Sequence, residues 1–146
     1  MEVSLVRNRV RTMLDRLKRP ADDRRANRRV QMDAATREYE AFLERTAVPL
    51  FKQVANVLRA EGYSFDVFTP GGSVRLIAAR GQDDYIELVL DTNGAAPKLV
   101  GRSSRSKAGN INQTELVLNA TTDIGALTDE DILAFVLSEL EGLVDR

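Results

Sequence analysis

Residues 63–90 read YSFDVFTPGGSVRLIAARGQDDYIELVL. Apolar and polar side chains tend to alternate with a period of two in three stretches of this segment. They predict three strands, over residues 63–69, 74–80 and 85–90. The triplets Pro-Gly-Gly and Gly-Gln-Asp that separate the stretches are typical of turns. Because parallel neighbours need crossovers of about a dozen residues or more, turns this short predict antiparallel pairing.

Two more strands are expected on the C-terminal side of this segment, over residues 98–102 and 114–118. Between them, residues 103–112 are small, polar and basic. This composition favours an exposed loop or a long hairpin tip. The sheet should therefore hold about five strands.

The end of the chain carries the clearest helix signal. Thr128-Asp129-Glu130-Asp131 resembles a capping box, with Thr128 as the N-cap. A broad apolar stripe follows at helical spacing: Ile132, Leu133, Val136, Leu137, Leu140, Leu143 and Val144. We expect this C-terminal helix to pack on the apolar face of the sheet.

Before the strands, residues 33–60 have a strong helical period that ends near Gly62. Pro49 should kink or briefly break this helix, with Thr46 as a candidate cap. This second long helix should also pack on the sheet.

Residues 3–19 predict a further amphipathic helix. Its stripe consists of Val3, Val6, Val10, Met13, Leu14 and Leu17. Pro20 is expected to stop or kink this helix, or to open the next one. The segment could extend from the rest of the chain or fold back and bury its stripe.

The sequence thus predicts an α+β fold. We expect a long kinked N-terminal helical region, an antiparallel sheet of about five strands and a C-terminal helix packed on the sheet. Residues 1–30 would form a basic amphipathic helical arm, and residues 31–146 a single α+β domain.

The 146-residue chain contains neither cysteine nor histidine. This excludes disulfides, thiol nucleophiles, Cys/His zinc or iron sites and Ser-His-Asp catalysis. We therefore expect no enzyme activity and no cofactor. A chain without disulfides suits a reducing cytoplasm. No apolar run approaches the ~20 residues of a membrane-spanning helix, so no transmembrane segment is expected. The N-terminus lacks the long uncharged apolar core of a secretory signal, so none is expected either.

A net charge of −1 hides an uneven distribution. Residues 1–30 carry ten basic and four acidic side chains, a net +6, whereas the remainder carries 11 basic and 18 acidic ones, a net −7. The ten cations are Arg7, Arg9, Arg11, Arg16, Lys18, Arg19, Arg24, Arg25, Arg28 and Arg29. They suit an acidic protein partner, nucleic acid or anionic lipid, or they are the solvated face of a helix.

The expected loop at residues 102–107 is the second candidate contact region, through Arg102, Arg105 and Lys107. Cations and serine hydroxyls can follow a phosphate backbone. The alternative is an ordinary solvated turn. Both basic segments lack the aromatic side chains that stack on single-stranded bases.

Clustered carboxylates offer a weak metal signal at Asp83, Asp84, Glu87 and Asp91. Their spacing matches no calcium loop, and Asp91 precedes a turn signal, so we expect no metal site. Gly71 and Gly72 lack the lysine of a phosphate-binding loop and are better interpreted as a hairpin turn.

Three functional hypotheses follow. The first is a non-enzymatic protein-interaction module, an adaptor or accessory protein that forms a homodimer. The second is a nucleic-acid-binding protein that uses the basic arm and the 102–107 loop. The third and weakest is a small enzyme that uses carboxylates alone.

Overall fold

The computed structural model describes residues 1–94, 96–120 and 123–144, and it divides the chain into two compact units, residues 1–34 and 35–146. In chain order the elements are α1 (Val3–Phe42), the π-helical turn η1 (Leu43–Ala47), α2 (Val48–Ala60), β1 (Phe65–Phe68), β2 (Ser73–Ala78), β3 (Tyr85–Asp91), β4 (Lys98–Lys107), β5 (Asn110–Val117), the 3₁₀ turn η2 (Ile124–Ala126) and α3 (Asp129–Val144). This confirms the predicted α+β class, with long N-terminal helical structure, an antiparallel sheet and a C-terminal helix.

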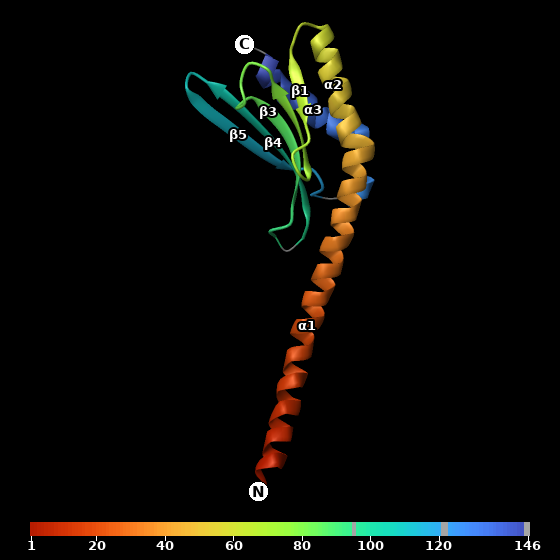
Figure 1. Ribbon diagram of the computed structural model, residues 1–146, viewed down its shortest axis with the longest axis vertical. Coiled ribbons are helices and arrows are strands. Elements are labelled where there is room, and N and C mark those ends of the chain that lie inside the picture. The colour runs from red at the N-terminus through yellow and green to blue at the C-terminus, as the bar shows by residue number, and fades with distance from the viewer. Residues whose placement is uncertain (95, 121–122, 145–146) are drawn as a thin grey trace. The chain divides into compact units, whose positions relative to one another are not determined.

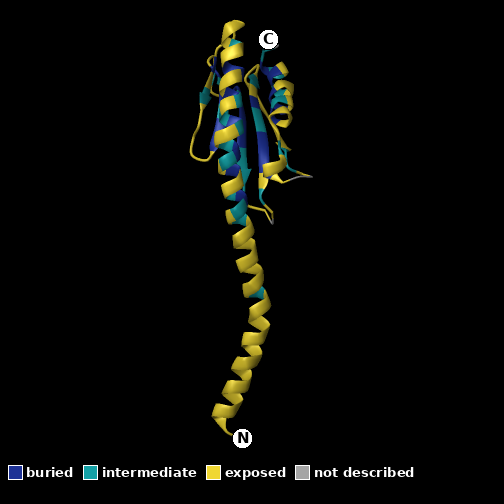
Figure 2. Cartoon of the chain, turned by 90° about the vertical axis from the view of Figure 1, so that its right-hand side faces the viewer, coloured by how far each residue is buried: buried dark blue, intermediate teal, exposed yellow. Residues whose placement is uncertain are grey.

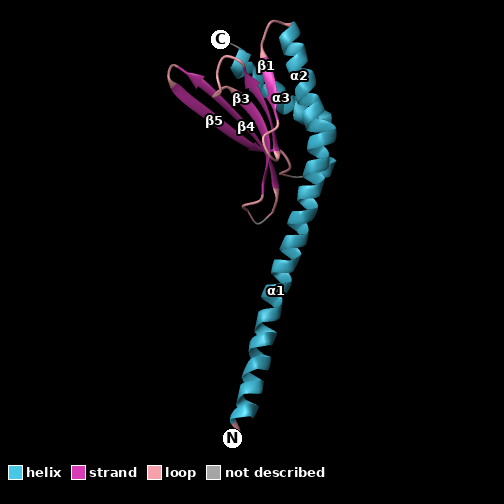
Figure 3. Cartoon of the chain, viewed as in Figure 1, coloured by secondary structure: helices cyan, strands magenta, loops and turns pink. Residues whose placement is uncertain are grey.

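The sheet has five antiparallel strands in the order β1-β2-β3-β4-β5, so every strand pairs with its neighbour in the chain (Figure 3). Short connections produce this meander. The turn signals predicted antiparallel neighbours and left the order of the strands open. At the β1–β2 turn, Gly72 has a φ of +78°, a conformation that glycine adopts without steric cost.

Of the two alternatives for residues 103–112, the structure shows the long hairpin tip. The exposed loop, and with it the basic loop expected at 102–107, is wrong. Strand β4 continues to Lys107 and β5 begins at Asn110. Only Ala108 and Gly109 connect them, with φ values of +52° and +82°. Positive φ at both central residues is what a type I′ hairpin turn requires. The polar residues of β4 and β5 belong to the strands because they pair across the hairpin as far as Lys107 and Asn110.

Helix α1 does not stop at Pro20, contrary to one of the alternatives above, because Pro20 lies inside it. Proline removes one backbone donor from a helix. The residues on either side of it are exposed or half-buried, so water can satisfy the carbonyl that loses its partner.

The interruption expected near Pro49 is the π-helical turn η1. Pro49 then lies in the first turn of α2, directly after this π-helical turn. Thr46 is not the cap that we expected: Ala47 takes the N-cap position, and no side chain caps this helix.

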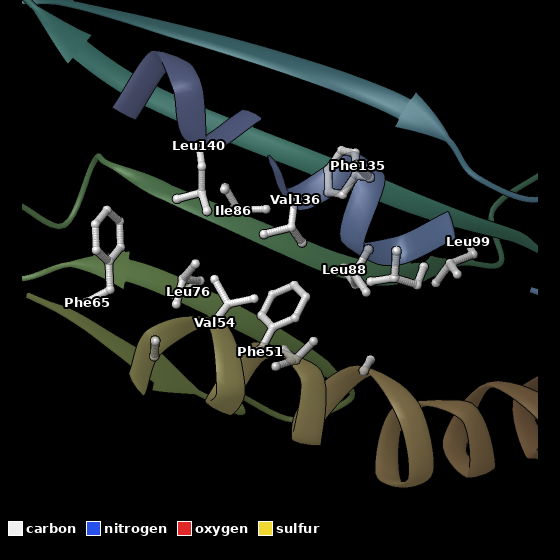
Figure 4. Close-up of a cluster of buried hydrophobic side chains, with 14 of the residues drawn as sticks. Phe51, Val54, Phe65, Leu76, Ile86, Leu88, Leu99, Phe135, Val136 and Leu140 are labelled. Carbon is white, nitrogen blue, oxygen red and sulfur yellow. The ribbon is translucent and has the colours of Figure 1, made fainter. Parts of the chain in front are cut away.

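Helices α2 and α3 cover one face of the sheet (Figure 1). Helix α2 contacts β1 and β2, and α3 contacts β3 and β4. Figure 4 shows side chains of both helices meeting those of the strands in one apolar cluster. Its largest fully buried members include Phe51, Leu76, Ile86, Leu88 and Ile132. Each such side chain contributes about 1.5–3 kcal/mol by leaving water.

The predicted capping box opens α3. The Thr128 backbone N–H donates to Asp131 Oδ2 at 2.9 Å, and the Asp131 N–H donates to Thr128 Oγ1 at 3.3 Å. The two residues thus satisfy each other's otherwise unpaired donors.

The core face of α3 differs in detail from its predicted stripe. Leu137 is exposed, whereas Phe135, which the stripe left out, is buried. The reason lies on the sheet: Gly101 of β4 has no Cβ, and a Cβ at that position would lie 2.7 Å from Phe135 Cε1. The glycine leaves the room that the aromatic ring fills.

The first unit, residues 1–34, is entirely described and consists of the N-terminal part of α1. Every residue from Met1 to Pro20 is exposed (Figure 2). A single helix has no second element within its own unit against which to bury an apolar stripe. Among the described residues, no helix combines the length and the apolar character that crossing a bilayer requires.

Candidate functional site

The first unit carries an exposed apolar stripe along one face of its helix. We define it by the six residues that predicted the helix: Val3, Val6, Val10, Met13, Leu14 and Leu17. Their exposed fractions range from 43% to 73%. Scattered apolar side chains on a surface need no explanation, but a contiguous stripe along one helix face indicates an interaction surface.

All ten cations of the N-terminal segment are exposed as well. Arg7 and Arg9 lie on opposite borders of the stripe, and Arg16 lies on the same border as Arg9, as their helical spacing dictates. The apolar face ends at Leu17. Further along the same side of the helix, its place is taken by Arg24 and Arg28. The first unit is therefore a basic amphipathic helix over its first half and a basic helix over its second.

The three cations predicted to act together in the 102–107 segment do not share one surface. Successive side chains of a strand point to opposite faces, so Arg102 faces away from Arg105 and Lys107. Arg102 Nε donates to Glu115 Oε1 at 2.8 Å. Arg105 instead lies against Gly142 of α3. As a single basic contact region, this segment is not supported.

A row of alternating charges crosses the sheet on the face opposite to α2 and α3. Arg75, Glu87, Arg102 and Glu115 are direct cross-strand neighbours on β2, β3, β4 and β5. Arg75 Nε donates to Glu87 Oε2 at 2.9 Å, and Arg102 Nη1 lies 3.7 Å from Glu87 Oε1. The Arg75 guanidinium also stacks 4.2 Å above the Tyr85 ring.

Glu87 is buried, with 5% of its surface exposed, and its two arginines compensate its charge. Such a row fixes the register of four strands, since a slip of one residue would move every charge to the apolar face. We interpret it as a structural feature. The row was not predicted from the sequence, although one signal was present: Arg75 and Glu87 each interrupt an otherwise apolar strand.

Tyr39 has a clearly shifted pKa. Its hydroxyl donates to the carbonyl oxygen of Gly72, so the last turns of α1 are tied to the β1–β2 turn. Burial, and secondarily the negative charge of Glu87, raise the pKa of Tyr39 from its ordinary 10.0 to about 12. The hydroxyl is therefore a donor throughout the physiological range.

The carboxylates considered for a metal site do not assemble into one. Asp84 accepts from Arg80 Nε at 3.1 Å and from the Ser106 N–H at 2.8 Å. Glu87 is engaged by its arginines. Within residues 1–94, 96–120 and 123–144, no three acidic side chains are grouped closely enough to hold a cation.

Three hollows of the second unit could hold a ligand. A polar cavity of about 120 Å³ lies between β4 and α3, where Ser103 Oγ donates to Glu139 Oε2 at 2.7 Å. A groove of about 350 Å³ between α2 and α3 is lined mainly by leucine and valine. A third hollow, of about 710 Å³, is lined by Glu40 and Glu44, which are exposed carboxylates one helical turn apart.

None of these hollows contains the paired groups of a recognisable catalytic site. The polar cavity holds one carboxylate, whereas carboxylate-only hydrolysis requires two on opposite sides of a substrate. Glu40 and Glu44 project from the same helix side and face solvent. The apolar groove has no titratable lining residue.

Neither a protein-family model, a curated protein nor a solved structure matches this chain. Its function is therefore inferred from the surfaces described above.

Proposed function

We propose that this protein is a non-enzymatic interaction module, an adaptor or accessory protein of the cytoplasm, that self-associates through its first unit. The observation that carries this proposal is the exposed apolar stripe on a unit that consists of one helix. Burying such a stripe against a partner is favourable by about 25 cal/mol for each Å² of apolar surface removed from water.

The location of the hydrophobic core supports the same proposal. Among the described residues, every buried side chain lies at or beyond Ala35, so the second unit contains the hydrophobic core. The apolar side chains of residues 3–17 add nothing to that core. They are available to a protein partner, and a second copy of the chain offers an identical surface.

Light scattering after size-exclusion chromatography tests this proposal over a range of protein concentrations. We expect the mass of the full chain to rise toward that of a dimer in the micromolar range. Val10→Asp should keep the chain monomeric, because it places a charge within the stripe. Thr12→Asp introduces the same charge on the other side of the helix and should leave association unchanged. A full chain that stays monomeric at high micromolar concentration would refute self-association.

Nucleic-acid binding is the second candidate, and the ten exposed cations of the first unit favour it. Cations that contact phosphates release condensed counterions, so the affinity should fall steeply with salt. A titration of the full chain, and of a chain lacking residues 1–30, against duplex and single-stranded DNA at two salt concentrations tests it. Salt-sensitive binding lost with residues 1–30 would support this candidate, and no binding at low salt would refute it.

A further inference from the structure

The spacing within the apolar stripe is that of a coiled coil. Val3, Val6, Val10, Met13 and Leu17 follow one another in steps of 3, 4, 3 and 4 residues. This is the alternation of the a and d positions of a heptad, which keeps one seam facing a partner helix. All five side chains belong to α1 and are exposed. With Val3, Val10 and Leu17 at a, Val6 and Met13 fall at d.

The residues that border this seam determine which partner fits it. The g positions are Glu2, Arg9 and Arg16, and the e positions are Arg7, Leu14 and Ala21. In a parallel pair, each g side chain faces the e side chain five residues further along the other helix. Glu2 would then face Arg7 of the second copy, an opposite-charge pair. Arg9 and Arg16 would face uncharged residues, over which their aliphatic stems can pack.

An antiparallel arrangement places the same charges unfavourably. There, g residues face g residues, so Arg9 and Arg16 of one copy would meet those of the other. Arg7 would likewise lie along the border occupied by Arg7 of the second copy. Like charges at these positions oppose association. The sequence of the first unit is thus complementary to itself in the parallel orientation.

We propose that the first unit pairs with that of a second copy as a parallel, two-stranded coiled coil over residues 2–19. This inference rests on the proposed function, and it specifies the partner and the orientation of the proposed self-association. The seam ends where the next d position is Pro20 and the next a position is Arg24. Two and a half heptads are fewer than the three or four that usually define a coiled coil, so the dimer dissociates on dilution. Arg11, Lys18 and Arg19 lie on the outer surface of the pair.

Charge reversal tests the pairing of the borders. Glu2→Arg would replace an attraction by a repulsion and should weaken dimerisation severalfold in sedimentation equilibrium at low salt. Adding Arg7→Glu to the same chain restores an opposite-charge pair and should return the dissociation constant to within about twofold of the original. A double variant as weak as Glu2→Arg alone would overturn the parallel register.

Cysteine cross-linking tests the orientation, and the absence of native cysteines makes single-cysteine variants unambiguous. Met13→Cys at a d position should form a disulfide-linked dimer under mild oxidation. A parallel seam sets each d residue beside the same residue of the second chain. Asp15→Cys lies at f, on the outer surface, and is the matched control. An antiparallel seam sets d against a and would not link Met13→Cys to itself.

The outcomes separate this inference from the proposed function. A dimer that Val10→Asp abolishes, with no more cross-linking in Met13→Cys than in Asp15→Cys, overturns the parallel coiled coil and leaves self-association standing. A chain that remains monomeric overturns both. A monomer whose first unit instead binds vesicles containing phosphatidylserine would also overturn both and assign the stripe to an anionic lipid surface.

Discussion

Glu87 shows how one residue can organise several strands. Its carboxylate is buried between Arg75 and Arg102, which come from the strands on either side of β3. A carboxylate removed from water is costly unless cations and hydrogen bonds compensate it. Both arginines are partly exposed, so they lose less of their hydration on folding than the buried carboxylate that they share.

Glu87→Ala is expected to lower the free energy of unfolding by about 1.5–3 kcal/mol, because it removes the charge-assisted contacts that a buried carboxylate makes with Arg75 and Arg102. Glu115→Ala removes a carboxylate from the same row at an exposed position and should cost less than about 1 kcal/mol. Urea unfolding followed by circular dichroism measures both. Equal losses in the two variants would show that burial of Glu87 does not matter.

Tyr39 makes a prediction about alkaline pH. The folded chain raises the pKa of Tyr39 to about 12, so it holds the hydroxyl proton more tightly than the unfolded chain, where the ordinary value of 10.0 applies. The stabilisation is fully present below pH 10 and is lost as the pH rises toward 12.

We therefore expect the free energy of unfolding of the native chain to fall between pH 10 and pH 12 more steeply than that of Tyr39→Phe. Tyr39→Phe should also be about 1 kcal/mol less stable near pH 7, because the Gly72 carbonyl loses its donor. Urea unfolding at several pH values provides the comparison. Parallel curves for the two proteins above pH 10 would contradict the assignment.

At the scale of elements, the contact between β4 and α3 depends on the absence of a side chain at Gly101. Gly101→Ala would place a Cβ 2.7 Å from Cε1 of the Phe135 ring, and overpacking of this kind costs about 1–3 kcal/mol. Gly81→Ala is the control, since no atom lies within 4 Å of the position that its new methyl group would take. It should change stability by less than about 0.5 kcal/mol.

A second substitution distinguishes overpacking from a general effect of alanine in β4. Phe135→Leu removes the ring atoms that the new methyl group would meet. The cost of Gly101→Ala should therefore be smaller in the Phe135→Leu background than in the native chain, as a double-mutant cycle measures. An unchanged cost would mean that Gly101 matters for another reason.

At the scale of the whole molecule, we propose that folding and association belong to different parts of the chain. The hydrophobic core lies in the second unit, and the stripe lies in the first. Residues 35–146 alone should therefore unfold cooperatively, with a Tm within a few degrees of that of the full chain at a concentration where the full chain is monomeric. Differential scanning calorimetry checks this. A fragment without a cooperative transition would show that residues 1–34 are required for folding.

Local signals made most of the fold predictable from the sequence. Strand alternation and short turns predicted about five strands and their antiparallel direction, because short turns join antiparallel neighbours. The order of the strands stayed open until the structure showed it. The capping box at Thr128 was also predictable, since both partners lie within one helical turn. The sequence also showed the ten N-terminal cations and, from their helical spacing, the residues of the apolar stripe. Their exposure followed only from the structure.

The sequence by itself determined the class of fold, the antiparallel direction of strands joined by short turns, the helix that begins after Thr128 and the absence of cysteine and histidine chemistry. All of these depend on composition or on residues close together in the chain. Only the tertiary structure decided that β4 extends to Lys107, that Phe135 is buried over Gly101 and that Glu87 lies between two arginines. Each of these depends on a neighbour from another strand or helix, and no local pattern specifies which residue that neighbour will be.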